Sequence, residues 1–164
     1  MHLKIKNKFF SLGGSSKVLN DKNEKYLLVR GRMFSITKKK FVKDLSKKTI
    51  FMVRNKFWSW IQRKAFIYNE NKALVATVIR DVNLTAGFTV LGAEEEIRVV
   101  SDQIGSFSLT ILMGGKEIGK IKRPILTMTD TYEVDFEDEE DAPFLVALII
   151  AMDNIFDRQR RKSN

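Results

Sequence analysis

The stretch that decides the fold is the apolar run A-P-F-L-V-A-L-I-I-A-M at residues 142–152, which resumes as Ile-Phe at 155–156 after an Asp-Asn pair. Five consecutive helical positions point in all directions around the helix axis, and residues 144–148 are apolar at every one of them. Pro143 suits a first helical turn, acidic residues precede the run, and arginines follow it. The sequence therefore predicts a helix over about 142–160 that the rest of the chain surrounds.

A membrane-spanning helix is the alternative interpretation of this run. Its 11 uninterrupted residues would extend about 16 Å, whereas the hydrocarbon core of a bilayer is about 30 Å thick. A longer span would bring Asp153 and Asp157 into lipid, which is costly. The length favours a buried core helix and predicts no transmembrane span.

Composition is typical of a globular protein, with 44% hydrophobic and 30% charged residues in a chain of 164. This length fits one domain covering residues 1–164. The absence of cysteine excludes disulfides and thiolate metal sites. The N-terminus alternates apolar and basic residues instead of forming the apolar core of a signal peptide, so we expect a cytoplasmic protein.

Charge is distributed unevenly along the chain. Residues 1–64 carry 18 Lys and Arg against three acidic residues, whereas residues 65–164 carry 11 against 17. One interpretation is a surface for polyanions such as nucleic acid, anionic lipid or an acidic protein. The other is attraction between the two halves of one barrel. The sequence leaves both open.

Most of the chain before the run reads as short segments of alternating apolar and polar residues separated by turn residues, the pattern of antiparallel strands. Polar clusters at 20–23, 46–48 and 69–71 predict hairpin turns, and Gly114-Gly115 predicts a two-residue turn. Further strands are predicted at 33–37 and around 57–61. A sheet that curls around a helix is the expected architecture.

Three stretches carry a resemblance to a known family: KVLNDKNEKYLLVRGRMFSITKKKFVKD at 17–44, DTYEVDF at 130–136 and IIAMD at 149–153. They resemble the LURP-one-related family, which is related to phospholipid scramblases and to the tubby C-terminal domain. The resemblance implies an antiparallel barrel of about twelve strands that encloses a hydrophobic C-terminal helix. A lumen of that size needs a filling, and a helix about 10–12 Å across provides one.

Residues for catalysis are sparse. His2 is the only histidine, which excludes a Ser-His-Asp triad and a histidine-based metal site. Residues 114–120 match G-x-x-x-x-G-K, but Ile121 stands where a nucleotide-binding loop needs Ser or Thr, and strand alternation surrounds the match. We expect no enzyme activity, no metal and no cofactor.

Acidic residues crowd the stretch 130–141. Glu133, Asp135 and Glu137 are predicted to share one strand face, opposite Tyr132, Val134 and Phe136. A calcium site is one interpretation, although the stretch lacks the spaced ligands and central glycine of an EF-hand. The other interpretation is that Glu139, Glu140 and Asp141 stabilise the start of the helix and stay solvated.

Basic residues of the first half are the candidate binding residues for an anionic headgroup. They are Arg30, Arg32, Lys38, Lys39, Lys40, Lys43, Lys47, Lys48, Arg54 and Lys56. Trp58 and Trp60 would share a strand face beside them and offer aromatic contacts, although strand aromatics also serve as core packing. Charge reversal of Lys38, Lys39 and Lys40 is predicted to weaken binding.

The sequence thus favours a non-enzymatic module that binds anionic phospholipid headgroups at a membrane surface. The phosphoinositide binding of tubby domains, which the resemblance implies without transfer of individual residues, points the same way. Nucleic-acid binding and a partner-binding scaffold are the alternatives, since the same basic residues and Trp58 would serve a polynucleotide. The oligomeric state is not determined by the sequence.

Overall fold

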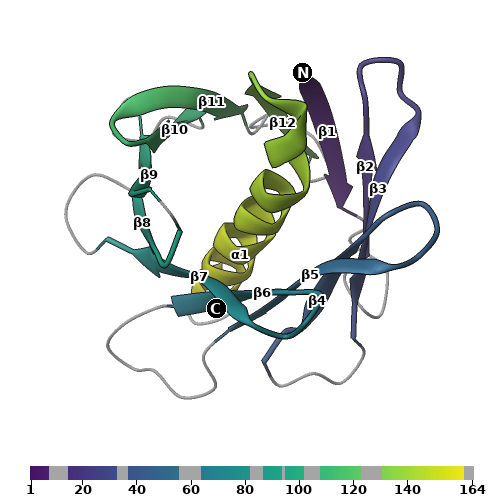
Figure 1. Cartoon of the computed structure of the whole chain (residues 1–164), viewed down its shortest axis with the longest axis horizontal. Helices are drawn as coiled ribbons and strands as arrows, with labels where there is room; N and C mark the ends of the chain where they lie inside the picture. The colour runs from purple at the N-terminus through teal and green to yellow at the C-terminus, as the bar shows by residue number, and fades with distance from the viewer. Residues whose placement is uncertain are drawn as a thin grey trace.

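The strands close into a barrel around the C-terminal helix (Figure 1). The structure is a computed structural model, and it describes residues 1–7, 15–32, 37–55, 64–81, 87–93, 95–101, 108–122 and 131–160, with side chains as far as residue 155. Twelve antiparallel strands each pair with their neighbours in sequence, and β1 pairs with β12 to close the ring. The predicted fold is confirmed.

The elements follow one another in simple order. The strands are β1 (His2–Asn7), β2 (Ser16–Leu19), β3 (Lys25–Gly31), β4 (Lys40–Lys43), β5 (Thr49–Asn55), β6 (Lys64–Asn69), β7 (Leu74–Arg80), β8 (Phe88–Leu91), β9 (Ile97–Ser101), β10 (Ser108–Met113), β11 (Lys116–Lys122) and β12 (Thr131–Phe136). A short 3-10 helix η1 (Glu139–Asp141) leads into α1 (Ala142–Arg160). The predicted strand around 57–61 lies outside the described residues. So do residues 33–36 of the predicted strand at 33–37, of which Thr37 is described and lies in a turn.

Helix α1 fills the lumen, as its apolar sequence requires. Every residue from Leu145 to Met152 is at most 2% exposed. The helix lies nearest to β4, β5, β6 and β7, and larger side chains help to fill the other side, among them Phe88, Ile97 and Ile111. Among the described residues, no helix has both the length and the hydropathy that crossing a bilayer requires.

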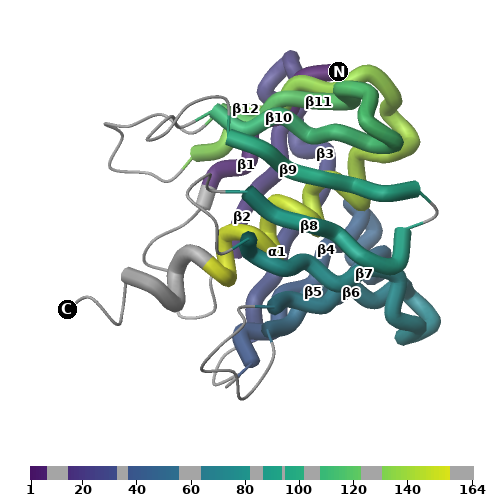
Figure 2. The backbone as a smooth tube through the Cα atoms, turned by 90° about the vertical axis from the view of Figure 1, so that its left-hand side faces the viewer, coloured from purple at the N-terminus to yellow at the C-terminus, as the bar shows by residue number. Residues whose placement is uncertain are grey.

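Because neighbouring strands are antiparallel, consecutive connections alternate between the two ends of the barrel (Figure 2). At one end lie the connections β2–β3, β4–β5, β6–β7, β8–β9 and β10–β11, together with the start of α1. We call this the turn end. At the other, the loop end, lie the connections β1–β2, β3–β4, β5–β6, β7–β8, β9–β10 and β11–β12, together with the end of α1.

Three hairpins of the turn end share one construction. The side-chain oxygen of the first turn residue accepts a hydrogen bond from the backbone N–H four residues later. These pairs are Asn20 with Glu24 at 2.9 Å, Asp44 with Lys48 at 2.8 Å and Asn69 with Ala73 at 2.9 Å. A residue with positive φ stands between them in each case, namely Asn23, Lys47 or Lys72. All three hairpins also contain a shift of strand register typical of a β-bulge.

The hairpin of β10 and β11 is built differently. Gly114 and Gly115 have φ of 55° and 82°, the conformation of a two-residue type I′ turn, in which both central residues need positive φ. The predicted Gly-Gly turn is therefore confirmed. The G-x-x-x-x-G-K match spans this turn and strand β11, with no helix following it, so the nucleotide-binding interpretation is excluded by the local fold.

Candidate anion-binding surface

The predicted basic residues that the structure describes come from three neighbouring strands, β3 to β5, and their connections. Lys56, Trp58 and Trp60 lie outside the described residues. The others share one sector of the wall, but they differ in which way they face and in what they contact. Those contacts decide which side chains remain available to a ligand.

Lys40 faces the lumen. Its side chain is 12% exposed, and its Nζ lies 3.2 Å from Oδ2 of Asp153 in α1, whose side chain is 8% exposed. The hydroxyl of Tyr132 donates to the other carboxylate oxygen at 2.7 Å. Lys40 thus forms a buried ion pair and lies apart from the outer surface. Sequence reasoning missed Asp153 as its partner, because the Asp-Asn pair at 153–154 looked like a break in the apolar run.

Three further candidates are engaged in local contacts. The Nζ of Lys48 lies 2.6 Å from Glu70 at the turn end, and this hydrogen bond and charge raise the pKa of Lys48. Lys43 donates from Nζ to the carbonyl of Lys47 at 3.1 Å. The Arg54 guanidinium donates to the Tyr68 hydroxyl at 2.7 and 3.1 Å, and it lies 4.9 Å from the centre of that ring.

Arg30 and Arg32 belong to a different set, exposed on the outside of the barrel toward the loop end. Lys6 of β1 and Lys17 of β2 stand directly opposite each other on the neighbouring strands, and both are exposed. Lys17 is in turn opposite Leu28, two residues before Arg30 on the same face of β3. We name Lys6, Lys17, Arg30 and Arg32 the basic wall.

None of the four side chains of the basic wall forms an ion pair with a described residue. Like charges directly opposite each other on a sheet are destabilising, so the Lys6–Lys17 pairing costs stability. Sequence reasoning missed both lysines, because each looked like an ordinary solvent-facing residue of an alternating strand. Their pairing depends on the register of β1 and β2.

Apolar side chains continue the outer surface beyond the basic wall. Phe41 of β4 stands opposite Arg30 on one side and Met52 of β5 on the other. Phe41, Met52 and Leu28 are only half-buried, although they point away from the lumen. This sector therefore combines exposed cations that form no ion pair with the described residues and half-buried apolar surface.

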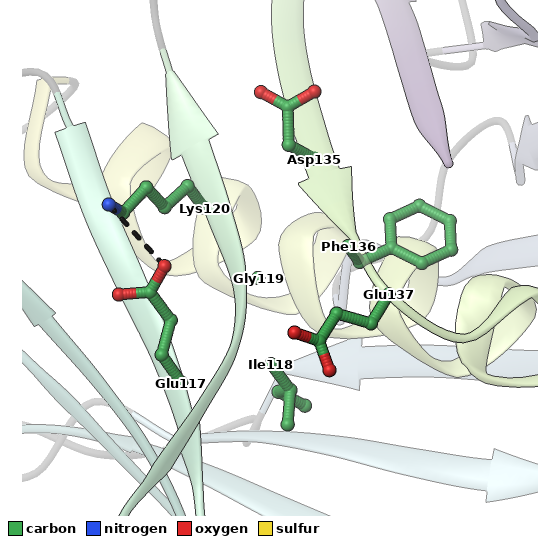
Figure 3. A pocket seen from close by; sticks show the side chains of 7 residues that line it. All are labelled: Glu117, Ile118, Gly119, Lys120, Asp135, Phe136 and Glu137. Atoms are coloured by element: carbon green, nitrogen blue, oxygen red, sulfur yellow. Dashed lines mark ion pairs between the residues drawn. The ribbon is translucent and has the colours of Figure 1, made fainter.

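The wall from β9 to β12, which adjoins the basic wall where β12 pairs with β1, differs in that several of its described charges form ion pairs. Arg98 pairs with Glu96 at 2.8 Å, Lys116 with Glu137 at 3.2 Å, and Lys120 with Glu117 at 3.3 Å. Figure 3 shows the last pair beside a shallow depression of about 260 Å³ between β11 and β12.

Gly119 forms the floor of this depression. A Cβ at that position would come within 2.8 Å of the Asp135 carbonyl oxygen, so the two backbones approach too closely for any side chain. The lining of the depression includes the carboxylates of Glu117, Asp135 and Glu137. Against these three carboxylates the lining contains one cation, Lys120, which is paired with Glu117, so the depression does not suit an anionic ligand.

The acidic stretch before α1 is arranged largely as the alternation predicted. Tyr132, Val134 and Phe136 are buried, and Asp135 is exposed on the other face. The Asp138 carboxylate accepts from the backbone N–H of Glu140 at 2.9 Å and so caps η1. In the part of the chain that the structure describes, no three or more His, Cys, Asp or Glu side chains are grouped to hold a metal ion.

Comparison with known proteins agrees with this architecture. A crystal structure of a protein from Arabidopsis thaliana is similar with a TM-score of 0.64 and 15% sequence identity, over 94% of this chain and 91% of that chain. At this identity the likeness concerns the fold alone. No curated protein matches the chain. The family model described as LURP-one-related matches residues 1–153, so the chain belongs to the LURP-one-related family.

Proposed function

We propose that this protein is a non-enzymatic module that binds anionic phospholipid headgroups through the basic wall. The observation that carries the proposal is the apposition of Lys6 and Lys17 beside Arg30 and Arg32, without a paired carboxylate among the described residues. A sheet that holds like charges together gains stability when an anion binds between them. Phosphate groups are suitable anions for clustered lysine and arginine side chains.

The neighbouring apolar surface favours a membrane over a polynucleotide. Leu28, Phe41 and Met52 give the basic sector an apolar margin that would lie at the boundary between headgroups and acyl chains. Each basic residue near an anionic membrane contributes about 1 kcal/mol. Four such residues give a weak, salt-sensitive and reversible attachment, as expected for a peripheral protein. Anionic lipids are concentrated in the cytoplasmic leaflet, so we place the protein at that surface.

The test compares two charge reversals in one hairpin. Lys17→Glu alters the basic wall, whereas Lys22→Glu makes the same change of net charge in the turn of that hairpin, at the turn end of the barrel. We expect Lys17→Glu to weaken sedimentation with phosphatidylcholine vesicles containing phosphatidylserine about 5- to 30-fold, and Lys22→Glu to have little effect. Vesicles of phosphatidylcholine alone are the lipid control.

Two results would overturn the proposal. One is sedimentation with anionic vesicles that both variants reduce equally, because net charge and not the wall would then determine binding. The other is binding of a labelled oligonucleotide that Lys17→Glu weakens, without any binding to vesicles. That outcome would assign the basic wall to nucleic acid.

A further inference from the structure

Lys38 has an unusual backbone conformation, with φ of 48°. Residues other than glycine rarely adopt this left-handed region, and they do so where the surroundings impose it. Lys47 and Lys72 have similar values inside tight hairpin turns. Lys38 instead lies in the connection between β3 and β4 at the loop end, directly after Thr37, which is in a turn.

The core helix and a neighbouring strand hold this connection from inside the barrel. The Asn154 side-chain amide donates from Nδ2 to the Lys38 carbonyl at 3.1 Å, and the backbone N–H of Asn55 donates to the Thr37 carbonyl at 2.8 Å. Asn154 is fully buried, and its backbone carbonyl accepts a hydrogen bond from Nδ2 of the Asn55 side chain at 3.1 Å. Two residues after Lys38, at the start of β4, Lys40 forms an ion pair with Asp153.

The same connection is joined to the basic wall. The backbone N–H of Arg32 donates to the Lys39 carbonyl at 2.9 Å, which extends the pairing of β3 with β4 beyond the last strand residues. In this extended pairing Arg32 lies opposite Lys39. The position of Arg32 therefore depends on a backbone segment, residues 37–40, that α1 holds on its inner side.

We propose that Asn154 and Asp153 are positioning residues for the basic wall. By holding residues 37–40, with Lys38 in its left-handed conformation, they place Arg32 before any ligand arrives. The core helix thus preorganises the outer binding surface, in addition to filling the lumen. Binding to a preorganised surface avoids the entropic cost of ordering the segment at the moment of contact. The proposal rests on the function proposed above.

The experiment compares two substitutions in α1 of the full-length chain. Asn154→Ala removes the hydrogen bond to Lys38, whereas Leu148→Ala destabilises the helix in the middle of the apolar run. Denaturation midpoints of both variants are measured first, and Ile149→Val is added as a milder control to bracket the stability of Asn154→Ala. Vesicle affinity is then compared in phosphatidylcholine vesicles with and without phosphatidylserine.

We expect Asn154→Ala to weaken vesicle binding about fivefold relative to controls of equal stability, the effect of losing one hydrogen bond. Hydrogen exchange is the second readout. The backbone N–H groups of Arg32 and Asn55 donate to the carbonyls of Lys39 and Thr37. In Asn154→Ala we therefore expect these two N–H groups to exchange about tenfold faster than those of core residues such as Val29. In Leu148→Ala the exchange rates of all of these N–H groups should rise together.

The two proposals fail in distinguishable ways. Absence of vesicle binding by the unaltered protein would overturn the proposed function. Hydrogen exchange of the Arg32 and Asn55 backbone N–H groups would still test whether α1 fixes the conformation of residues 37–40. Equal exchange patterns in Asn154→Ala and Leu148→Ala would overturn the positioning role. So would faster local exchange combined with unchanged vesicle affinity.

Discussion

The hairpins of the turn end and the polar residues of α1 at the loop end are held by different kinds of contact. At the turn end, the hairpins close themselves through side-chain oxygens that bond four residues along the chain, as Asp44 does with Lys48. The Lys48–Glu70 pair there is exposed. At the loop end, the described residues of α1 form largely buried contacts with segments about a hundred residues away, such as Asp153 with Lys40 and Asn154 with Asn55.

This difference shows what apolar burial leaves undetermined. The hydrophobic effect has no direction, so a helix that is apolar on all sides gains similar energy at many rotations and depths inside an apolar lumen. Hydrogen bonds and ion pairs do have direction. The polar contacts of Asp153 and Asn154 at the loop end therefore set the rotation and depth of α1, while the local turns of the other end set the strand registers.

The largest effect on stability is expected from breaking the buried ion pair between Lys40 and Asp153. Asp153→Ala leaves the Lys40 ammonium without its counter-ion, and we expect the free energy of unfolding to fall by about 3–5 kcal/mol. Lys48→Ala, which breaks the exposed pair of the turn end, should cost less than about 1 kcal/mol. Urea denaturation of the two variants measures both values.

A double variant, Asp153→Ala with Lys40→Met, sharpens this prediction. It removes the unpaired charge, so it should recover much of the stability lost in the single variant. Equal costs for Asp153→Ala and Lys48→Ala would contradict the contrast between the two ends.

A moderate effect is expected at the left-handed lysines. Lys38 at the loop end and Lys47 at the turn end both have positive φ, so the glycine variant should be more stable than the alanine variant by about 1 kcal/mol at each position. Lys6 in β1 is the control, because in an ordinary strand the order should reverse, with glycine less stable by about 0.5–1 kcal/mol. An alanine variant at Lys38 as stable as the glycine variant would show that the helix does not impose strain there.

The smallest effect is expected in the pH dependence of the stability that the turn at Asp44 contributes. The hydroxyl of Ser46, followed by backbone N–H groups and the charge of Lys48, lowers the pKa of Asp44 below its ordinary value of 3.8. A carboxylate with a lowered folded-state pKa contributes stability above the unfolded value, and this contribution is lost as the pH falls through the folded value. The loss therefore falls below pH 3.8.

Asp44→Asn keeps the hydrogen-bond acceptor and removes the titration. We expect the variant to lose less stability than the unaltered protein when the pH is lowered through this window. Carboxyl chemical shifts of Asp44 followed by NMR would give its pKa directly. A titration midpoint of Asp44 at or above its ordinary value of 3.8 would show that this turn is not the source of the pH dependence of stability.

Local patterns in the sequence were enough to predict the architecture. An apolar run without a polar face predicts a surrounded helix, alternation predicts strands, and polar clusters such as that at Asn69 predict hairpins, because each property is decided by residues close together in the chain. The resemblance to the LURP-one-related family added the strand number and the closed barrel.

Only the tertiary structure decided which basic side chains lie together on the outer surface. Lys40 points inward and Lys6 lies opposite Lys17 because of how the strands are registered, and a shift of one residue would move each side chain to the other face of the sheet. Likewise, Asp153 looked like an interruption until the fold placed it beside Lys40 and Tyr132. Pairings between distant segments arise from closure of the barrel, so the local sequence predicted the elements while the fold determined which charged side chains are paired and which lie on the outer surface.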